Sequence, residues 1–286
     1  MTSGVMVVGM HRSGTSAVTR VINLMGVPLG RADDIYTAND NPSGHWESRT
    51  LCDLNDLILR AFGGFEMAMP PMPASWLRSR RAESLRDVMR ASFQDVYRTE
   101  RWLWKDPRIC LTLPLWRQVL SDFCVVFVVR NAGPVTHSLN RREGWPLSFC
   151  YALWDDYNRR AVAGLSGLPV VRVDFDSMMK DPVEQVGRLA DGLAALGVEV
   201  NHDVDGVAAS LNPRPDSGGA DELGRGHRLA TVLRSGPEVA QSFRAPSLPP
   251  QPWWVRPALR ARCSWLKVRE RWTERVGLLD PRAAES

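Results

Sequence analysis

The stretch VMVVGMHRSGTSAVTRVINLMG, residues 5–26, constrains the fold more than any other part of the chain. Its first four apolar residues predict a buried strand, and the apolar period after Ser16 predicts a helix. Gly9 and Gly14 permit a tight turn between the two. A strand that enters a helix through such a turn directs backbone N–H groups and the positive end of the helix dipole at one point. The stretch therefore predicts an anion-binding loop.

The side chains of this loop indicate what kind of anion it binds. Arg12 adds a fixed positive charge with planar donors, and Thr15 and Ser16 place hydroxyl groups in the first helical turn. The lysine that reaches the phosphates in nucleoside triphosphatases is absent, and no strand-ending aspartate for magnesium accompanies Ser16. We therefore expect a phosphate-bearing ligand that is bound without a metal ion.

Strand-like and helix-like segments alternate along most of the chain, which predicts an α/β fold of three layers, α/β/α, with a central parallel sheet. The predicted strands are residues 5–8, 102–104, 124–129 and 170–173. The predicted helical faces lie within 17–25, 51–62 and 183–196. We expect a core of residues 1–210, an irregular basic region over 211–250, and an irregular to helical extension over 251–286 that is rich in tryptophan.

Composition limits the partners of the chain. The net charge is +4, and residues 251–286 account for all of it with eight Lys or Arg and four Asp or Glu, so the first 250 residues are neutral, which argues against nucleic acid as a partner. The five cysteines are scattered, which argues against a disulfide framework or a zinc site. No apolar run approaches the roughly 18 residues of a spanning helix, and we expect a cytoplasmic protein.

The loop GMHRSGTS, residues 9–16, resembles the 5′-phosphosulfate loop of sulfotransferases that use 3′-phosphoadenosine 5′-phosphosulfate. In that family a Lys or Arg at the position of Arg12 contacts the bridging and sulfuryl oxygens. The resemblance implies that Gly14, Thr15 and Ser16 hold the 5′-phosphate of this co-substrate. Two further loop residues are expected at the same site, Ser13 and, as a residue that orients the loop, His11. The resemblance also implies a P-loop-like fold of the bacterial type, without a metal.

A second stretch, CVVFVVRNAGPVTHSLNRREG at residues 124–144, resembles the 3′-phosphate motif of the same family. Arg130 follows a predicted strand, and Ser138 lies in the helix after it. A guanidinium and a hydroxyl group on adjacent elements can meet a dianion that the first loop does not reach. The turn-rich stretch DELGRGHR, residues 221–228, is a candidate lid in which Arg225 and Arg228 contact the same phosphate; the alternative is solvated loop charge.

The stretch WKDPR, residues 104–108, places Lys105 at the end of a predicted strand, where ligands bind in open α/β sheets. In cytosolic relatives a catalytic histidine follows two residues after the comparable lysine. Pro107 stands there in this chain, so Lys105 remains as a group that stabilises charge, together with Arg12. Asp106 and Arg108 are expected to form a structural ion pair beneath the site.

The general base is sought in DNPSGHWES, residues 40–48, which resembles the NP-x-G-x-W/F-E segment of bacterial sulfotransferases. The segment precedes a helix that is predicted to begin near Trp46. By analogy with relatives that use a glutamate, Glu47 is the predicted general base, and His45 is the competing candidate. The alternative is that Ser43 caps the helix while Glu47 only complements its dipole.

The resulting hypothesis is transfer of a sulfuryl group from 3′-phosphoadenosine 5′-phosphosulfate to a hydroxyl group of a carbohydrate, glycolipid or small molecule. A P-loop kinase for a small molecule and a non-catalytic protein that binds an adenine nucleotide are the alternatives. The tail has an apolar stripe from Trp265 to Leu279. It predicts docking on the core or on another subunit, with peripheral membrane contact as the alternative.

Overall fold

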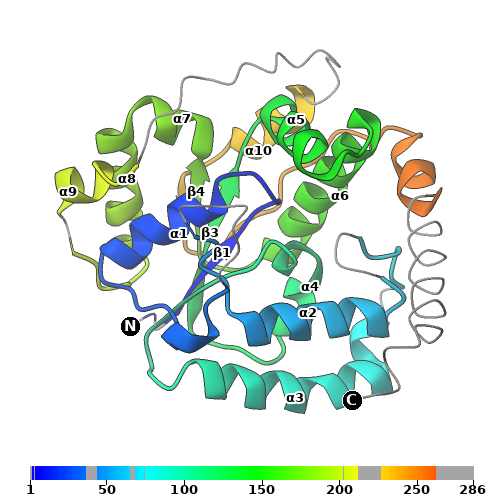
Figure 1. The fold of residues 1–286 in the computed structure, drawn as a ribbon, viewed down its shortest axis with the longest axis horizontal. Coiled ribbons are helices and arrows are strands. Elements are labelled where there is room, and N and C mark those ends of the chain that lie inside the picture. Colours follow the sequence, from blue (N-terminus) through cyan, green and yellow to red (C-terminus); the bar gives the residue numbers. More distant parts are fainter. Residues whose placement is uncertain are drawn as a thin grey trace, which may run out of the picture.

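A central sheet of five strands organises the molecule (Figure 1). The computed structural model describes residues 2, 4–36, 44–64, 68–73, 75–201, 203–211 and 227–261. The strand order is β2-β1-β3-β4-β5. The strands are β1 (Gly4–Val8), β2 (Trp102–Lys105), β3 (Phe123–Val129), β4 (Val170–Asp174) and β5 (Val239–Ala240). The first four are mutually parallel and β5 is antiparallel to β4, so the predicted parallel sheet is confirmed with one short antiparallel edge strand.

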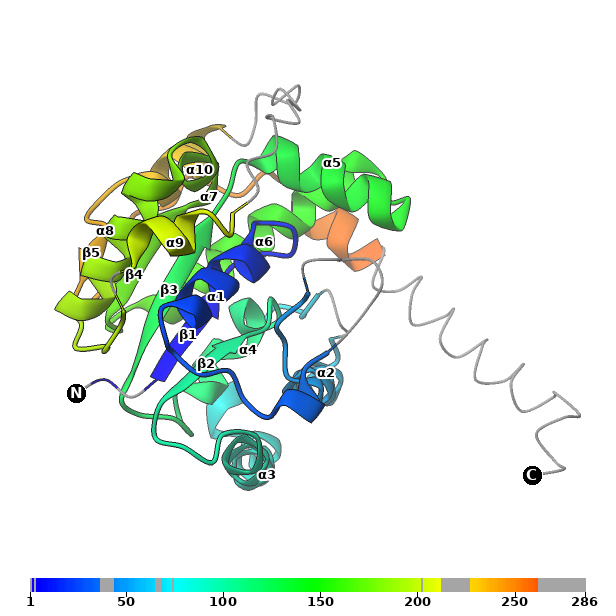
Figure 2. The same cartoon turned by 60° about the vertical axis from the view of Figure 1, so that its left-hand side comes forward.

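Helices cover both faces of the sheet, which confirms the three layers (Figures 1 and 2). One apolar cluster packs α2 (Arg49–Ala61), α3 (Arg80–Val96), α4 (Ile109–Trp116), α5 (Ala132–Glu143), α6 (Leu147–Leu165) and α10 (His227–Arg234) on one face. A second packs α1 (Thr15–Leu24), α7 (Phe175–Lys180), α8 (Pro182–Ala195) and α9 (Val204–Ala208) on the other. Short 3₁₀ helices occupy Ala32–Asp34 and Trp76–Arg78.

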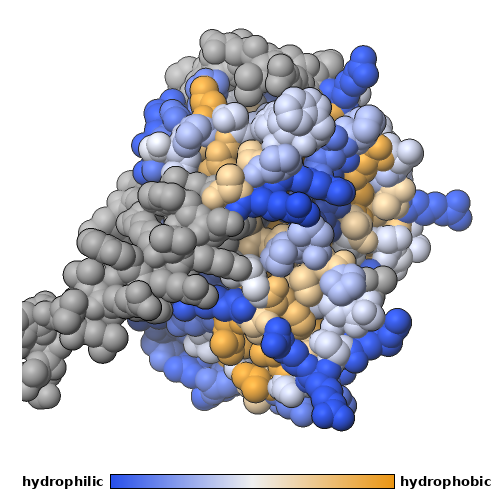
Figure 3. Space-filling model, turned by 90° about the vertical axis from the view of Figure 1, so that its right-hand side faces the viewer, coloured by the Kyte–Doolittle hydropathy of each residue, from blue (hydrophilic) through white to orange (hydrophobic). Residues whose placement is uncertain are grey.

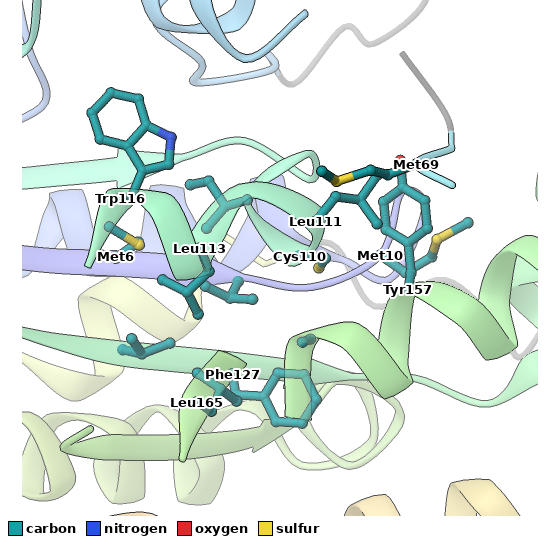
Figure 4. Close-up of a cluster of buried hydrophobic side chains, with 14 of the residues drawn as sticks. Met6, Met10, Met69, Cys110, Leu111, Leu113, Trp116, Phe127, Tyr157 and Leu165 are labelled. Carbon is teal, nitrogen blue, oxygen red and sulfur yellow. The ribbon is translucent and has the colours of Figure 1, made fainter. Parts of the chain in front are cut away.

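The two cores follow from the alternation of side chains along each strand. In β1, Val5 and Val7 belong to one apolar cluster, whereas Met6 and Val8 belong to the other. Because helices cover both faces, β3 is apolar at all seven positions rather than at every second one. Figure 4 shows the core on the α4 side, where Phe127 of the sheet lies near Leu165 of α6 and Trp116 of α4 lies near Met6.

Parts of the predicted irregular region are ordered. Residues 211–250 contain α10 and β5, which the sequence pattern did not indicate, and residues 255–261 are helical. Trp254 precedes that last helix and packs on Tyr151 of α6, with ring centroids 5.5 Å apart. Figure 3 looks onto this side of the molecule and shows apolar side chains gathered between charged ones. The predicted stripe from Trp265 to Leu279 lies outside the described residues. None of the described helices is both long and apolar enough to cross a membrane.

A buried polar network joins α2 to the segment that follows β2. The side-chain amide of Asn55 donates to Asp106 Oδ2 at 2.8 Å. The carbonyl oxygen of the same side chain accepts from Thr112 Oγ1 at 2.9 Å and from Trp116 Nε1 at 2.8 Å. Asp106 Oδ1 lies 3.1 Å from Arg108 Nη1, which confirms the predicted structural ion pair. The network therefore ties α4 and the segment after β2 to the middle of α2.

We expect Asn55→Leu to lower the free energy of unfolding by about 2–4 kcal/mol, because it removes the partner of Asp106 Oδ2 and of Trp116 Nε1 and one of the two acceptors of Thr112 Oγ1, all of them buried. Urea unfolding followed by circular dichroism measures this change. Leu57→Ala is the control on the same helix, because Leu57 is 50% exposed and its truncation should cost under about 1 kcal/mol. Equal losses in the two variants would show that the network contributes nothing specific.

Candidate functional site

A cleft of about 970 Å³ lies at the carboxyl ends of the parallel strands, the edge at which open α/β sheets bind ligands. Residues that follow β1, β2, β3 and β4 all contribute to it. Its lining includes most of the predicted site residues: His11, Arg12, Gly14, Thr15, Ser16, His45, Glu47, Lys105, Arg130 and Ser138. Ser13 is buried within the loop and does not line the cleft.

The loop between β1 and α1 has the geometry of an anion site. Gly14 stands immediately before α1 in the left-handed conformation (φ 88°), so the first N–H groups of α1 face the cleft. Arg12 also has a positive φ, of 65°, which an arginine adopts only when its surroundings hold it there. A Cβ on Gly14 would lie 2.2 Å from the ring of Phe175. The position therefore requires glycine both for its conformation and for its close packing.

The two predicted phosphate motifs meet in the cleft. Arg12 Nε donates to Ser138 Oγ at 2.8 Å, although 126 positions separate the two residues in the chain. Arg130 Nη1 donates to the backbone oxygen of Arg12 at 3.2 Å. Their assigned contacts with a phosphate stay predictions, but the fold brings all three side chains to one wall.

Two aspartates that the sequence analysis missed, Asp174 and Asp176, form ion pairs with the arginines on this side of the cleft. Asp176 Oδ1 lies 3.1 Å from Arg130 Nε, and Asp176 Oδ2 lies 3.0 Å from Arg234 Nη2. Arg234 also forms an ion pair with Asp174 and donates to the side chain of Asn131. Asp174 ends β4, so the rule for strand ends indicates this position, whereas no sequence signal points to Arg234.

The two arginines that were predicted to contact the 3′-phosphate from a lid, Arg225 and Arg228, are not among the described residues that line the cleft. Arg228 lies on α10 but is exposed and does not line the cleft; Arg234, further along the same helix, does. Arg225 lies outside the described residues. The 211–250 region therefore contributes a cation to the cleft, but this cation is Arg234 rather than the predicted Arg228.

Lys105 and Glu47 form an ion pair on the other side of the loop. Lys105 Nζ also donates to Ser16 Oγ at 3.1 Å, so the pair sits directly beside the first turn of α1. The Lys105 side chain is only 1% exposed and that of Glu47 is 13% exposed. A buried ammonium is tolerable only with such partners. Cys52 Sγ lies 3.6 Å from Glu47 Oε2 and is positioned to donate to it.

The segment that presents Glu47 differs from the expectation. Helix α2 begins at Arg49 rather than near Trp46, and its N-cap is Ser48, whose side chain accepts from Leu51 N. Ser43, the predicted cap, lies outside the described residues. Asp34 accepts hydrogen bonds from the side chain of Ser48 and from Thr50, and so fixes this helix start. Glu47 thus precedes the helix, and its side chain is directed by the ion pair rather than by the helix dipole.

The two histidines of the cleft differ in environment. His45 accepts from Ser16 Oγ through its backbone oxygen at 3.3 Å, and its ring lies edge-on to Tyr36. Burial lowers the pKa of His11 well below its usual value, and nearby positive charges, Arg108 foremost, add to this shift. Its Nε2 has no hydrogen-bond partner among the described residues. Within the part of the chain that the structure describes, no group of three His, Cys, Asp or Glu side chains could hold a metal ion.

A model of the sulfotransferase family matches residues 4–201. Similar solved structures include the sulfotransferase domain from the curacin biosynthetic pathway, at 14% identity and a TM-score of 0.44 over 83% of this chain and 93% of that one. The sulfotransferase STF1 of Mycobacterium tuberculosis H37Rv has 16% identity and a TM-score of 0.43, with 82% and 76% covered. The sulfotransferase domain of the Synechococcus PCC 7002 olefin synthase has 16% identity and a TM-score of 0.42, with 77% and 82% covered. No curated protein matches the chain.

Gly14→Ala tests whether the loop is built around its second glycine. Both Gly14 and Gly26 have positive φ, but a Cβ on Gly26 meets nothing within 4 Å, whereas one on Gly14 meets Phe175. We expect about 1–2 kcal/mol of destabilisation in each variant from backbone strain, and about 1–3 kcal/mol more in Gly14→Ala from overpacking. Denaturant unfolding of the two variants gives the difference. Similar losses would mean that Phe175 moves aside without cost.

Proposed function

The chain belongs to the sulfotransferase family, and from this premise we propose that it moves a sulfuryl group from 3′-phosphoadenosine 5′-phosphosulfate to a hydroxyl group of a carbohydrate, glycolipid or small molecule. Membership makes the protein an enzyme of sulfuryl transfer and implies the co-substrate. The observation that carries the residue assignment is the Lys105–Glu47 ion pair beside Ser16, because it puts an acid–base group and a fixed charge next to the anion loop.

The donor set of the cleft fits this co-substrate. The N–H groups at the start of α1, together with the hydroxyl groups of Thr15 and Ser16, suit the 5′-phosphate. Arg12 suits the sulfuryl and bridging oxygens. The contact of Arg12 with Ser138 and the approach of Arg130 to the same loop favour one continuous site for the 5′ and 3′ ends of the nucleotide.

The reaction assigns distinct tasks to the charged residues. The acceptor oxygen forms a bond to sulfur, the bond between sulfur and the 5′-phosphate oxygen breaks, and the hydroxyl proton passes to a base. We assign the base to Glu47. Lys105 and Arg12 neutralise charge on the transferred group and the leaving oxygen. Because Lys105 contacts both Glu47 and Ser16, a shift of its ammonium toward the reacting sulfuryl group would release the Glu47 carboxylate for proton transfer.

The alternatives make different demands. A P-loop kinase would use magnesium ATP and would need a lysine after the second glycine of its loop. In this chain Thr15 stands at that position, between Gly14 and Ser16. A non-catalytic nucleotide-binding protein would bind the bisphosphate product but transfer nothing. Binding and turnover therefore separate the three functions.

We expect the protein to bind 3′,5′-bisphosphoadenosine at about micromolar concentration and to bind AMP more weakly, because only the former has a 3′-phosphate for Arg130. Arg130→Ala should reduce the preference for the bisphosphate by about tenfold to a hundredfold, since it removes a charge-assisted contact. Calorimetric titration measures both affinities. Arg244→Ala is the control, because Arg244 is exposed and makes no ion pair or hydrogen bond with the described residues. Binding of magnesium ATP alone would support the kinase instead.

Glu47→Gln should lower the rate of sulfuryl transfer by about 10²-fold to 10⁴-fold while bisphosphate affinity changes little, because the amide cannot take the proton. The measurement is the release of bisphosphate from the co-substrate with the best acceptor of a hydroxyl panel. His45→Asn run in parallel tests the competing base. If Glu47→Gln keeps a near-normal rate, Glu47 is not the base; if His45→Asn alone loses the rate, His45 is.

A further inference from the structure

The order of the strands divides the cleft into two halves. β1, with the anion loop at its end, lies between β2 and β3. Arg130 and Asp174 stand on the β3 and β4 side, and the ion pair of Lys105 and Glu47 stands on the β2 side. If the nucleotide spans from the loop to Arg130, as proposed above, the acceptor must reach the sulfuryl group from the half that contains Glu47. The inference below rests on that assignment.

The two halves differ in how their charges are compensated. On the nucleotide side, Arg130 and Arg234 already have the carboxylates of Asp174 and Asp176 as partners. On the acceptor side, Glu47 is the one acidic residue among the described residues that line the cleft, and Lys105 occupies it.

Arg20 is a cation of this half that no carboxylate of the described residues compensates. It lines the cleft from α1, and its guanidinium carbon lies 4.8 Å from the ring centroid of Trp46, the residue next to Glu47. Its Nη1 donates to Asn23 Oδ1 at 2.9 Å, and no carboxylate of the described residues forms a salt bridge with it. Among the described residues, Arg20 is therefore held by neutral groups, Asn23 and Trp46, while it lines the cleft.

The backbone of Trp46 supports a binding role for this corner. Trp46 has a positive φ of 58°, a strained conformation for a bulky residue that persists only where its surroundings enforce it.

We propose that the acceptor carries a negatively charged group, a carboxylate, sulfate or phosphate, near the hydroxyl group that is sulfated, and that Arg20 recognises this group. A guanidinium held by an aromatic face and an amide is preorganised for an oxyanion, and it loses little side-chain freedom on binding. The substrate class is thus an anionic hydroxyl compound, such as a uronic acid or a sugar that already bears an acidic substituent.

The test uses a matched pair of probes, 4-nitrophenyl β-D-glucuronide and 4-nitrophenyl β-D-glucoside, which differ in a carboxylate at one carbon. Each is titrated by calorimetry into the protein saturated with 3′,5′-bisphosphoadenosine, so that no turnover is needed. We expect the glucuronide to bind about tenfold tighter or more, since the extra contact is charge-assisted. Raising the salt concentration should reduce this ratio, because Arg20 is only partly buried.

Variants locate the effect. Arg20→Met keeps an apolar stem over Trp46 but removes the charge, and it should bring glucuronide binding to the level of the glucoside. Arg20→Lys should retain part of the preference, and Arg244→Met, the control, all of it. Equal binding of the two probes, binding of neither, or an unchanged ratio in Arg20→Met would overturn the inference.

The same titrations separate this inference from the proposed function. Bisphosphate binding is measured first in each variant. If the wild-type protein does not bind bisphosphate, the proposed function fails. If bisphosphate binds but the probe ratio is one, only the acceptor inference fails. A loss of bisphosphate affinity in Arg20→Met, with the probe ratio unchanged, would assign Arg20 to the nucleotide instead.

Discussion

The buried ion pair between Lys105 and Glu47 is the contact on which the architecture of the site depends. It joins the end of β2 to the segment before α2, and a lysine that is 1% exposed would be strongly destabilising without it. Hydrogen bonds in the neighbouring segments hold both partners in position. The Asn55–Asp106 hydrogen bond fixes the segment after Lys105, and Asp34 fixes the start of α2 after Glu47. The reactive pair is therefore held between two rigid polar networks.

The opposite side of the cleft follows another electrostatic arrangement. Arg130 and Arg234 approach each other at the edge of the sheet, which is tolerable because Asp176 lies between them. The cations are thus oriented before any ligand arrives. A phosphate that binds there would compete with Asp174 and Asp176 for the same guanidinium groups, so the carboxylates reduce affinity while they preserve geometry. No comparable carboxylate accompanies Arg20 among the described residues, and this contrast distinguishes the two halves of the cleft.

Much of the fold was predictable because each local signal agreed with the global arrangement. Fully buried parallel strands are continuous apolar runs, so β1 and β3 are evident in the sequence. The loop after β1 needs Gly14, and Lys105 is the last residue of β2, so both positions were predictable from the local pattern of strand, turn and helix. The start of α2 was misplaced because Trp46 and Glu47 suit a helix by composition. Only the contacts of Ser48 with Leu51 and Asp34 decide that it begins at Arg49.

The sequence by itself determined the α/β class, the anion loop and the residues that follow the strands, because these depend on neighbours in the chain. The tertiary structure decided which charges meet. Arg12 and Ser138 are 126 positions apart, and Lys105 and Glu47 are 58 apart. Arg234 reaches the cleft from a segment with no readable pattern, while Arg228 on the same helix does not. Side-chain pairing across the sheet edge depends on strand order and helix orientation, which local periodicity does not encode.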